Sequence, residues 1–330
     1  MTTLALLPDP STPLDEATAH AAFADILDGK VPDEAVARFL IDLAERDETA
    51  IEIAAAARVL RERMIAVKAP VGAIDVCGTG GDGQHSLNIS TAVAIVVAAA
   101  GVPVAKHGNR AASSKAGAAD TLEALGLDLD RASARAEESL ADLGIAFLFA
   151  QKHHPVLARM APIRRAIGRR TVFNLIGPLA NPARVTRQLL GVARVDFLPT
   201  VATALDYLGA EAAMVVAGEE SLDELSIAGP SRIVRIGPRA GELTITPEDA
   251  GLPRHSLDAI RGGDAAFNAA ALRALLMGEP GPYRDAVLLN AAAALIVADR
   301  ADDWRDAVEE AAEVIDKGLA NALLNCWIAF

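Results

Sequence analysis

The stretch that decides the fold is Asp75-Val-Cys-Gly-Thr-Gly-Gly-Asp-Gly83, followed closely by Asn88-Ile-Ser-Thr91. Residues 73–76 predict a short strand before the glycines, and residues 91–100 predict a helix after them. A glycine-rich loop between a strand and a helix presents bare backbone N–H groups, which bind phosphate together with the helix dipole. The hydroxyls of Ser90 and Thr91 add further donors or metal ligands. The stretch therefore predicts a phosphate site.

The spacing narrows the kind of phosphate ligand. Gly78, Gly80 and Gly83 satisfy the G-x-G-x-x-G pattern, but a dinucleotide site also needs an acidic residue about 20 residues later, at the end of the second strand. Lys106 occupies that place, and a cation suits another phosphate better than a ribose diol. The Walker Gly-Lys-Ser/Thr sequence does not occur in the chain. The pattern therefore indicates a phosphate loop of a third kind.

The second motif is Lys106-His-Gly-Asn-Arg110, followed by Ala111-Ala-Ser-Ser-Lys115, and we expect it directly after a second strand at residues 102–105. Three cations, two serines and an amide within so few residues are suited to a polyanion. Two alternatives stay open: His107 can be a packed loop histidine, and Arg110 and Lys115 can be structural or solvated. Asp120-Thr-Leu-Glu123 has the spacing of a capping box and predicts the start of the next helix.

The remaining sequence divides into a region of helices alone and a region in which strands alternate with helices. Residues 16–68 carry apolar side chains at three- and four-residue spacing, which predicts helices only. Further strands are predicted at residues 146–149, 190–193, 213–216, 233–236 and 242–246, with a loop at 174–182 and mainly helices from 265. We therefore predict an α/β fold: a small α-helical domain plus a larger α/β domain with a mostly parallel central sheet flanked by helices.

The composition excludes several classes of protein. The formal net charge is −13 and no long Lys/Arg run occurs, which argues against a nucleic-acid partner. Cys77 and Cys326 form no CxxC pair, so we expect neither a disulfide framework nor a zinc site. The most apolar run, residues 91–104, is interrupted and shorter than the roughly 20 residues of a membrane helix, and no signal peptide is evident. We expect a cytoplasmic protein without membrane or nucleic-acid partners.

Both motifs resemble those of the anthranilate phosphoribosyltransferase family, which is related to the pyrimidine nucleoside phosphorylases. The resemblance continues through residues 154–165, 171–182, 223–226 and 243–263, and covers nearly everything from about residue 20 onward. It implies an enzyme that transfers the phosphoribosyl group of 5-phosphoribosyl-1-diphosphate (PRPP) to the amine of anthranilate, in tryptophan biosynthesis. It also implies Mg²⁺ as cofactor. The principal alternative is a pyrimidine nucleoside phosphorylase, which would release a base with inorganic phosphate.

The resemblance also implies how the domains are arranged. It suggests a helical domain of residues 1–69 plus about 156–183, which would carry the dimer contact and the anthranilate side. Residues 70–155 plus 184–330 would form the α/β domain that binds PRPP and Mg²⁺. A homodimer through the helical domain is expected, and apolar Phe39 and Leu43 are compatible with that surface, although they can equally be core.

The same resemblance assigns residues to each ligand. Those expected to bind PRPP are Gly78, Gly81, Asp82, Ser86, Asn88, Ile89, Ser90, Thr91, Lys106, His107, Gly108, Asn109, Arg110, Ala111, Ala112, Ser113, Ser114 and Ala118. Those expected around anthranilate are Gly78, His107, Asn109, Arg164, Gly177 and Pro178. The expected magnesium ligands are Ser90, Asp223 and Glu224, which supply the hard oxygens that this ion prefers.

Each assignment has a chemical reason and, in places, a plainer alternative. Arg164 would clamp the anthranilate carboxylate with its guanidinium fork, although periodicity alone does not separate it from Arg165, Arg169 and Arg170. Asp223-Glu224 taken alone is typical of a solvated acidic loop. Magnesium and Lys106 would neutralise the departing diphosphate while the uncharged amine attacks from the opposite face. No proton acceptor is evident from the sequence.

Overall fold

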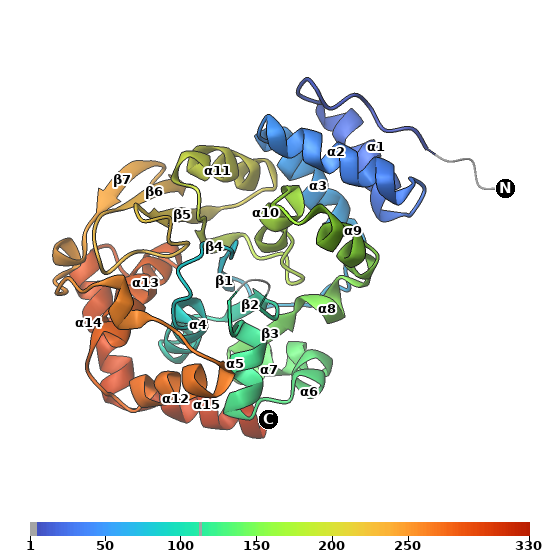
Figure 1. Ribbon diagram of the computed structural model, residues 1–330. Helices are drawn as coiled ribbons and strands as arrows, with labels where there is room; N and C mark the ends of the chain where they lie inside the picture. Colours follow the sequence, from blue (N-terminus) through green and yellow to red (C-terminus); the bar gives the residue numbers. More distant parts are fainter. Residues whose placement is uncertain (1–4, 112–113) are drawn as a thin grey trace.

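The computed structural model describes residues 5–111 and 114–330. Figure 1 shows three N-terminal helices gathered at one corner of a larger α/β body. These helices are α1 (Glu16–Leu27), α2 (Asp33–Glu45) and α3 (Ala50–Glu62). A capping box starts α3, because Thr49 and Glu52 satisfy each other's backbone N–H groups. The prediction that this region is helical is confirmed.

One seven-stranded sheet forms the centre of the α/β body, with strand order β3-β2-β1-β4-β5-β6-β7. The first five strands in this order run parallel, while β6 and β7 are antiparallel additions at one edge. The strands are β1 (Ile74–Gly78), β2 (Val104–Gly108), β3 (Ile145–Phe149), β4 (Arg187–Gly191), β5 (Ala212–Gly218), β6 (Ser231–Ile236) and β7 (Gly241–Ile245). The predicted mostly parallel sheet is confirmed.

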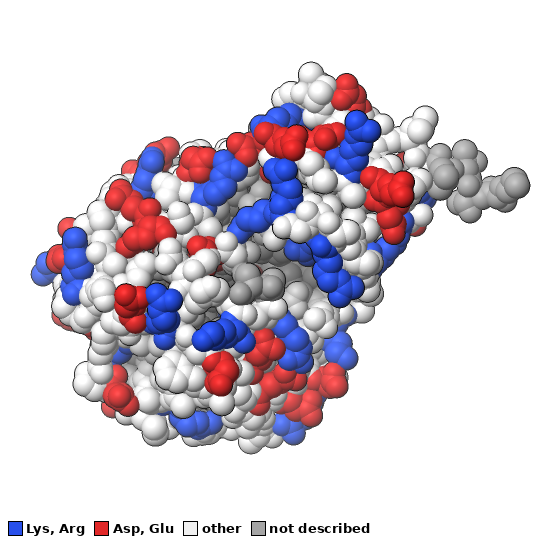
Figure 2. Space-filling model, in the orientation of Figure 1, with Lys and Arg blue, Asp and Glu red and all other residues white. Residues whose placement is uncertain are grey.

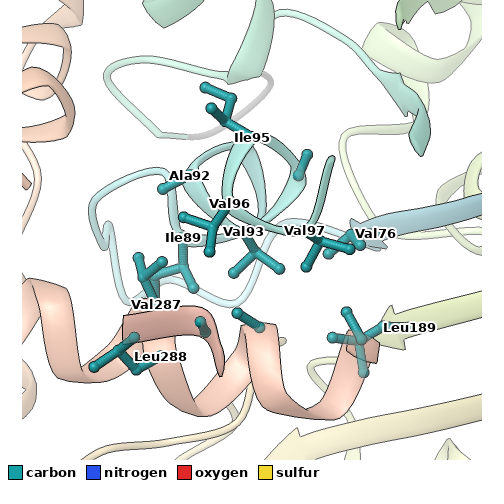
Figure 3. Close-up of a cluster of buried hydrophobic side chains, with 14 of the residues drawn as sticks. Val76, Ile89, Ala92, Val93, Ile95, Val96, Val97, Leu189, Val287 and Leu288 are labelled. Atoms are coloured by element: carbon teal, nitrogen blue, oxygen red, sulfur yellow. The ribbon is translucent and has the colours of Figure 1, made fainter. Parts of the chain in front are cut away.

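Helices cover both faces of the sheet, so the central strands are apolar on both sides, as parallel strands usually are. Val76 and Leu189 face a core formed with α4 (Ile89–Ala99), α5 (Ala118–Leu125), α12 (Ala265–Leu276), α13 (Pro282–Val297), α14 (Trp304–Asp316) and α15 (Leu319–Ala329). Their neighbours Cys77 and Leu190 face the opposite core. Figure 3 shows α4 lying against α13, with Val93 and Val97 pointing into that core. The helix that follows the glycine loop is therefore firmly anchored.

The opposite core joins the sheet to the N-terminal helices. It includes α9 (Met160–Ile167), α10 (Val172–Leu179) and α11 (Leu198–Tyr207). Both α9 and α10 pack on α2, and α10 also packs on α3. The smaller elements are α6 (Leu129–Ala134), α7 (Ala136–Asp142), α8 (Ala150–His153), η1 (Pro155–Ala158), η2 (Val195–Phe197), η3 (Pro247–Ala250) and η4 (Leu257–Ile260). The boundary that assigns residues 156–183 to the helical domain stays a prediction.

Two predicted boundaries near the site are wrong. Lys106, His107 and Gly108 were expected after the second strand, but they pair with β3 and form the end of β2. The next helix begins at Ala118 and not at Asp120. Asp120 is the third residue of α5, and its carboxylate accepts the Gly117 N–H at 2.9 Å, so it closes the cap from inside the helix.

The predicted loop at residues 174–182 is also wrong, since most of it belongs to α10. The helix starts where the Thr171 N–H donates to Asn174 Oδ1 at 3.1 Å, and its buried apolar face includes Phe173 and Ile176. Pro178 lies in the last turn of α10, so its missing N–H interrupts the helical hydrogen bonds only close to the point where the helix ends. Tertiary packing therefore outweighs the Gly-Pro signal on which the loop prediction depended.

Two observations bear on partners. None of the helices that the described residues form is long and apolar enough to cross a membrane. Phe39 and Leu43 are core residues, with exposed fractions of 3% and 0%, so they do not mark a dimer surface. The homodimer and the cytoplasmic location stay predictions.

Candidate active site

The site lies where the carboxyl ends of β1, β2 and β4 meet, at Gly78, Gly108 and Gly191. Gly78 and Gly191 are register partners, and a β-carbon on either would collide with Asp223. Only glycine at both positions lets the loop that carries Asp223 lie directly on the strand ends. Sequence reasoning missed Gly191, because an isolated glycine at a strand end carries no local signal of a contact 32 residues away.

The glycine loop has the backbone shape that a phosphate cradle requires. Gly80, Gly81 and Gly83 have φ values of 68°, 71° and 77°, a region that side chains disfavour. The Gly80 N–H donates to Asp223 Oδ2 at 2.6 Å. The loop and the acidic segment are thus in direct contact, as the combined motifs predicted.

Three carboxylates, those of Asp82, Asp223 and Glu224, gather at this point. Burial, followed by the charge of Asp82, raises the pKa of Asp223 to about 7. Burial, followed by the charge of Asp223, raises the pKa of Glu224 to about 8. Like charges held together out of water favour a bound cation or protonation. The cluster therefore has the electrostatics of a cation site and differs from the solvated acidic loop that the sequence left open.

Lys106 supplies one positive charge within this cluster. Its side chain is buried, with an exposed fraction of 2%, and Nζ donates to Val76 O at 2.7 Å and to Ser90 Oγ at 3.1 Å. Its charge lowers the pKa of Glu224 against the effect of burial. Asp82, Lys106 and Glu224 thus meet in one place, which is the arrangement that the proposed polyphosphate pocket requires.

The first turn of α4 completes this side of the site. The Ser90 N–H donates to Glu224 Oε1 at 3.1 Å, while Ile89 and Thr91 are buried. The Asn88 side chain also makes structural contacts, since its Oδ1 accepts from Thr121 Oγ1 at 2.6 Å and from Asn268 Nδ2 at 2.9 Å. Asn88 therefore ties α4 to α5 and α12, which is a structural role that the sequence did not suggest.

Several further residues that sequence reasoning missed hold the acidic loop. The Asn290 amide on α13 bonds both backbone groups of Leu225, at 2.9 and 3.0 Å. Gln84 Nε2 donates to Glu220 O at 2.6 Å, which gives the unusual glutamine of the glycine loop a bridging role. Ser86 forms a bridge with Arg261 in the segment before α12. None of these pairings is local, so no sequence pattern could reveal them.

The loop after β2 is more exposed than the glycine loop. Asn109 and Arg110 are exposed, and Arg110 forms ion pairs with Asp120 and Glu123 on α5, which favours its structural role. The Ala111 N–H donates to Asp120 Oδ2 at 3.0 Å, and Ser114 is exposed. Ala118 lies beside Gly108 at the start of α5. The predicted Ala112 and Ser113 lie outside the described residues.

His107 faces the side of the site expected for anthranilate. Its N–H donates to Asp75 Oδ1 at 3.0 Å, and its ring lies 5.1 Å from that of His154 between centroids. Burial, and then the neighbouring His154 and His153, holds the pKa of His107 well below its usual value, whereas the Gly177 backbone acts in the opposite direction. The ring is therefore neutral, and Gly177 on α10 is close to it, while Pro178 is buried.

The structure separates the four arginines that the sequence could not. Arg169 pairs with Glu45, Arg170 bonds the glycine loop, and Arg165 is exposed. Arg164 is partly buried, and this desolvation lowers the pKa of its guanidinium. No carboxylate partner for Arg164 that would oppose this effect occurs among the described residues. Figure 2 shows a hollow in the middle of one face with basic side chains on its rim. An unpaired guanidinium at half burial is suited to an incoming carboxylate.

The residues present fit a magnesium ion. Within residues 5–111 and 114–330, no set of three His, Cys, Asp or Glu side chains forms a complete metal cage. Magnesium needs no such cage, because it usually keeps waters and takes one or two carboxylates plus substrate phosphates. Asp223 and Glu224, with raised pKa values, and the Ser90 hydroxyl beside Lys106 supply that partial set.

Comparison with known proteins gives consistent matches along the chain. Residues 10–64 match the helical bundle domain of a glycosyl transferase family, and residues 71–321 match its α/β domain. The anthranilate phosphoribosyltransferase of Novosphingobium aromaticivorans is 67% identical over 329 residues, which cover 99% of both chains.

Solved structures agree with these sequence matches. The anthranilate phosphoribosyltransferase of Thermus thermophilus superimposes with a TM-score of 0.92 at 44% identity, over 97% of this chain and 96% of that one. The Saccharomyces cerevisiae enzyme in complex with PRPP and Mg has a TM-score of 0.88 at 30% identity, over 96% and 93%. The same yeast enzyme in complex with 4-fluoroanthranilate has a TM-score of 0.86 at 28% identity, again over 96% and 93%. The chain described here belongs to the anthranilate phosphoribosyltransferase family of pentosyltransferases.

Proposed function

We propose that this chain transfers the 5-phosphoribosyl group from PRPP to the amine of anthranilate, giving N-(5-phosphoribosyl)anthranilate and diphosphate. The observation that carries the proposal is the meeting of the glycine loop, Lys106 and the Asp223-Glu224 pair at the ends of β1, β2 and β4. The relatives reported above are anthranilate phosphoribosyltransferases, so the pyrimidine nucleoside phosphorylase alternative is not retained.

PRPP fits the glycine-loop side by charge and by donor type. Its diphosphate would meet the backbone N–H groups of residues 81–83 and the first turn of α4, as well as the charge of Lys106. Bound magnesium would be held by Ser90, Asp223 and Glu224, and it would neutralise charge on the departing diphosphate. The yeast relative in complex with PRPP and Mg supports a PRPP and magnesium site in this family.

Anthranilate fits the side that Arg164 and His107 border. The Arg164 guanidinium would bind the carboxylate through two hydrogen bonds, and Asn109, Gly177 and Pro178 would line the rest. The 4-fluoroanthranilate complex of the yeast relative supports an aromatic acid in this family. The neutral ring of His107 would place an uncharged surface beside the amine.

In the reaction the bond between ribose C1 and the diphosphate oxygen breaks, and its electron pair leaves with diphosphate. The amine nitrogen forms the new bond to C1 from the opposite face and then loses one proton. Lys106 stabilises the charge that develops on the leaving group, and such electrostatic stabilisation is usually the largest single contribution to catalysis. The uncharged aromatic amine needs little activation, so alignment of the two substrates supplies much of the remaining rate.

The test is a fluorescence assay on the purified chain. Anthranilate fluorescence should decline when PRPP and Mg²⁺ are both present, and should stay constant when either is left out. The proposal fails if anthranilate persists under all conditions while the chain cleaves thymidine in a phosphate-dependent manner. That result would restore the phosphorylase alternative.

A further inference from the structure

The segment between α9 and α10, residues 168–171, brings a helical-side arginine to the glycine loop. Arg170 Nη1 donates to Gly80 O at 2.7 Å and to Gly81 O at 3.2 Å. Arg170 follows Arg164 by only six residues, yet it bonds backbone oxygens of the loop expected to hold diphosphate. No role described above uses it.

Gly81 leaves room for the Arg170 guanidinium because it has no side chain. A β-carbon at Gly81 would lie 2.7 Å from Arg170 Nη1, and the residue has φ 71°. A side chain at position 81 would therefore strain the backbone and displace the guanidinium. The glycine is needed here for the arginine contact as well as for the turn.

The two bonds also fix which way the peptide planes face. In a trans peptide the N–H points opposite to the carbonyl of the same unit. Because the oxygens of Gly80 and Gly81 point to Arg170, the N–H groups of Gly81 and Asp82 point away from it. Neither N–H has a recorded acceptor within the part of the chain that the structure describes.

The Gly80 residue is held from a second direction. Its own N–H donates to Asp223 Oδ2 at 2.6 Å while its oxygen accepts from Arg170. The loop is thus fastened between a cation from the helical side and a carboxylate of the acidic cluster. Movement of Arg170 would release one of these two attachments.

We propose that Arg170 is a positioning residue that holds the glycine loop with its N–H groups turned toward the diphosphate. The inference rests on the proposed function, because it assigns PRPP to that loop. Arg170 thereby links the segment that carries Arg164, on the anthranilate side, to the donor side of the reaction. Arg170 itself need not touch either substrate.

The experiment compares Arg170→Gln with Arg169→Gln by steady-state kinetics in saturating Mg²⁺. Arg169 is the matched control, since it is adjacent and exposed, and pairs with Glu45 on α2 instead of the loop. We expect Arg170→Gln to raise the KM for PRPP about 10- to 100-fold, as misplaced binding groups do. The KM for anthranilate should stay within about twofold of wild type for both variants.

Two further variants separate loop positioning from general structural support. Arg170→Lys keeps the charge but loses the fork, so it should recover part of the PRPP affinity. Gly81→Ala should reproduce the rise in the KM for PRPP, and combining it with Arg170→Gln should add less than the product of the single effects. Melting temperatures measured alongside identify variants that are simply unfolded.

The outcomes are distinct. If wild type shows no PRPP-dependent loss of anthranilate, the proposed function fails. If wild type is active but Arg170→Gln behaves like Arg169→Gln, the role of Arg170 is overturned. Equal rises in both KM values also overturn it, because they indicate a general loss of structure. Strictly multiplicative effects of Gly81→Ala and Arg170→Gln overturn it as well, because they show that the two residues act independently.

Discussion

The two sides of the site differ in whether the protein already provides bonding partners for their ionisable side chains. On the diphosphate side (residues 78–91, Lys106 and residues 222–226), Lys106, Asp223 and Glu224 each bond a backbone group or a neighbouring side chain. On the anthranilate side (His107, His154, Arg164 and α10), the Nε2 atoms of His107 and His154 have no hydrogen-bond partner among the described residues. Arg164 lacks a carboxylate partner there as well.

This difference suits the two substrates. A polyanion that binds with a metal requires fixed charged groups. Some of these groups repel one another, so the fold must hold them in place before the ligand arrives. A flat aromatic acid requires an apolar slot with one unpaired cation and neutral walls, which the acid itself completes on binding. We therefore expect damage on the diphosphate side to affect PRPP binding, the chemical step or the metal, and damage on the other side to affect the affinity for anthranilate.

The largest effect is expected for Lys106→Met on the diphosphate side. The change removes the buried charge that lies between Val76 O and Ser90 Oγ and that opposes the repulsion around Glu224. We expect kcat to fall about 10²- to 10³-fold, as when one preorganised group at a developing charge is lost. Initial rates at saturating PRPP, anthranilate and Mg²⁺ measure this.

Lys152→Met is the control, since Lys152 is an exposed lysine paired with Asp130 on the surface. It should leave kcat unchanged. A folded Lys106→Met protein with a nearly normal kcat would show that the leaving group does not depend on this charge.

A second effect on the same side concerns the metal. Glu224→Gln keeps the shape but removes a charge that the acidic cluster offers to Mg²⁺, so the ion should bind more weakly. We expect the Mg²⁺ concentration at half-maximal rate to rise about 10- to 100-fold, with the rate largely recovered at high Mg²⁺. A magnesium titration of the initial rate measures both.

Glu219→Gln is the matched variant for this titration. Glu219 is exposed and lies in the same loop region, so its loss changes the net charge by the same amount without reaching the cluster. If the two variants shift the titration equally, the effect is one of overall charge, and Glu224 is not a ligand.

The contrast between the two sides also explains what the sequence could reveal. The glycine loop, its strand and its helix are contiguous, so the phosphate site could be predicted from local pattern alone. Asp223 reaches the loop from about 140 residues away, and its placement came from the family resemblance. Gly191 and Asn290, which hold that segment in place, carry no pattern of their own.

The anthranilate side was harder to predict because it depends on tertiary contacts. Glu45 pairs with Arg169 and the glycine loop binds Arg170, and both partners are distant in sequence, so local pattern could not separate these arginines from Arg164. The Gly177-Pro178 pair predicted a loop, whereas packing of Phe173 and Ile176 produces α10. The predicted ends of two strands differ from the structure for the same reason. Lys106 and Gln188 are buried within β2 and β4, although side chains of these types usually lie on the surface.

Arg164→Ala tests the anthranilate side directly. Loss of a charge-assisted fork costs roughly 1.5–3 kcal/mol, so the KM for anthranilate should rise about tenfold to a hundredfold. The KM for PRPP should stay close to wild type, which is the reverse of the pattern expected for Arg170→Gln. Arg165→Ala is the control, because Arg165 is exposed on the same helix. Equal changes in both variants would remove Arg164 from the carboxylate site.

The smallest effect concerns stability on the anthranilate side. Burial, followed by the charge of His153, lowers the pKa of His154 to about 4. The folded chain therefore keeps this ring neutral while the unfolded chain takes up a proton below about pH 6.5, so acid favours unfolding. Between pH 7 and pH 5 the contribution of His154 to the free energy of unfolding should fall by about 2 kcal/mol.

His154→Leu should remove this loss, so its free energy of unfolding should fall less than that of wild type between pH 7 and pH 5. Urea unfolding at both values measures the difference, and His85→Asn, at an exposed position with φ 52°, is the control. The comparison with wild type is essential, because Asp223 and Glu224 have raised pKa values and contribute stability that increases as the pH falls. The two sides of the site thus respond to acid in opposite directions, and identical pH dependence in His154→Leu and wild type would contradict that conclusion.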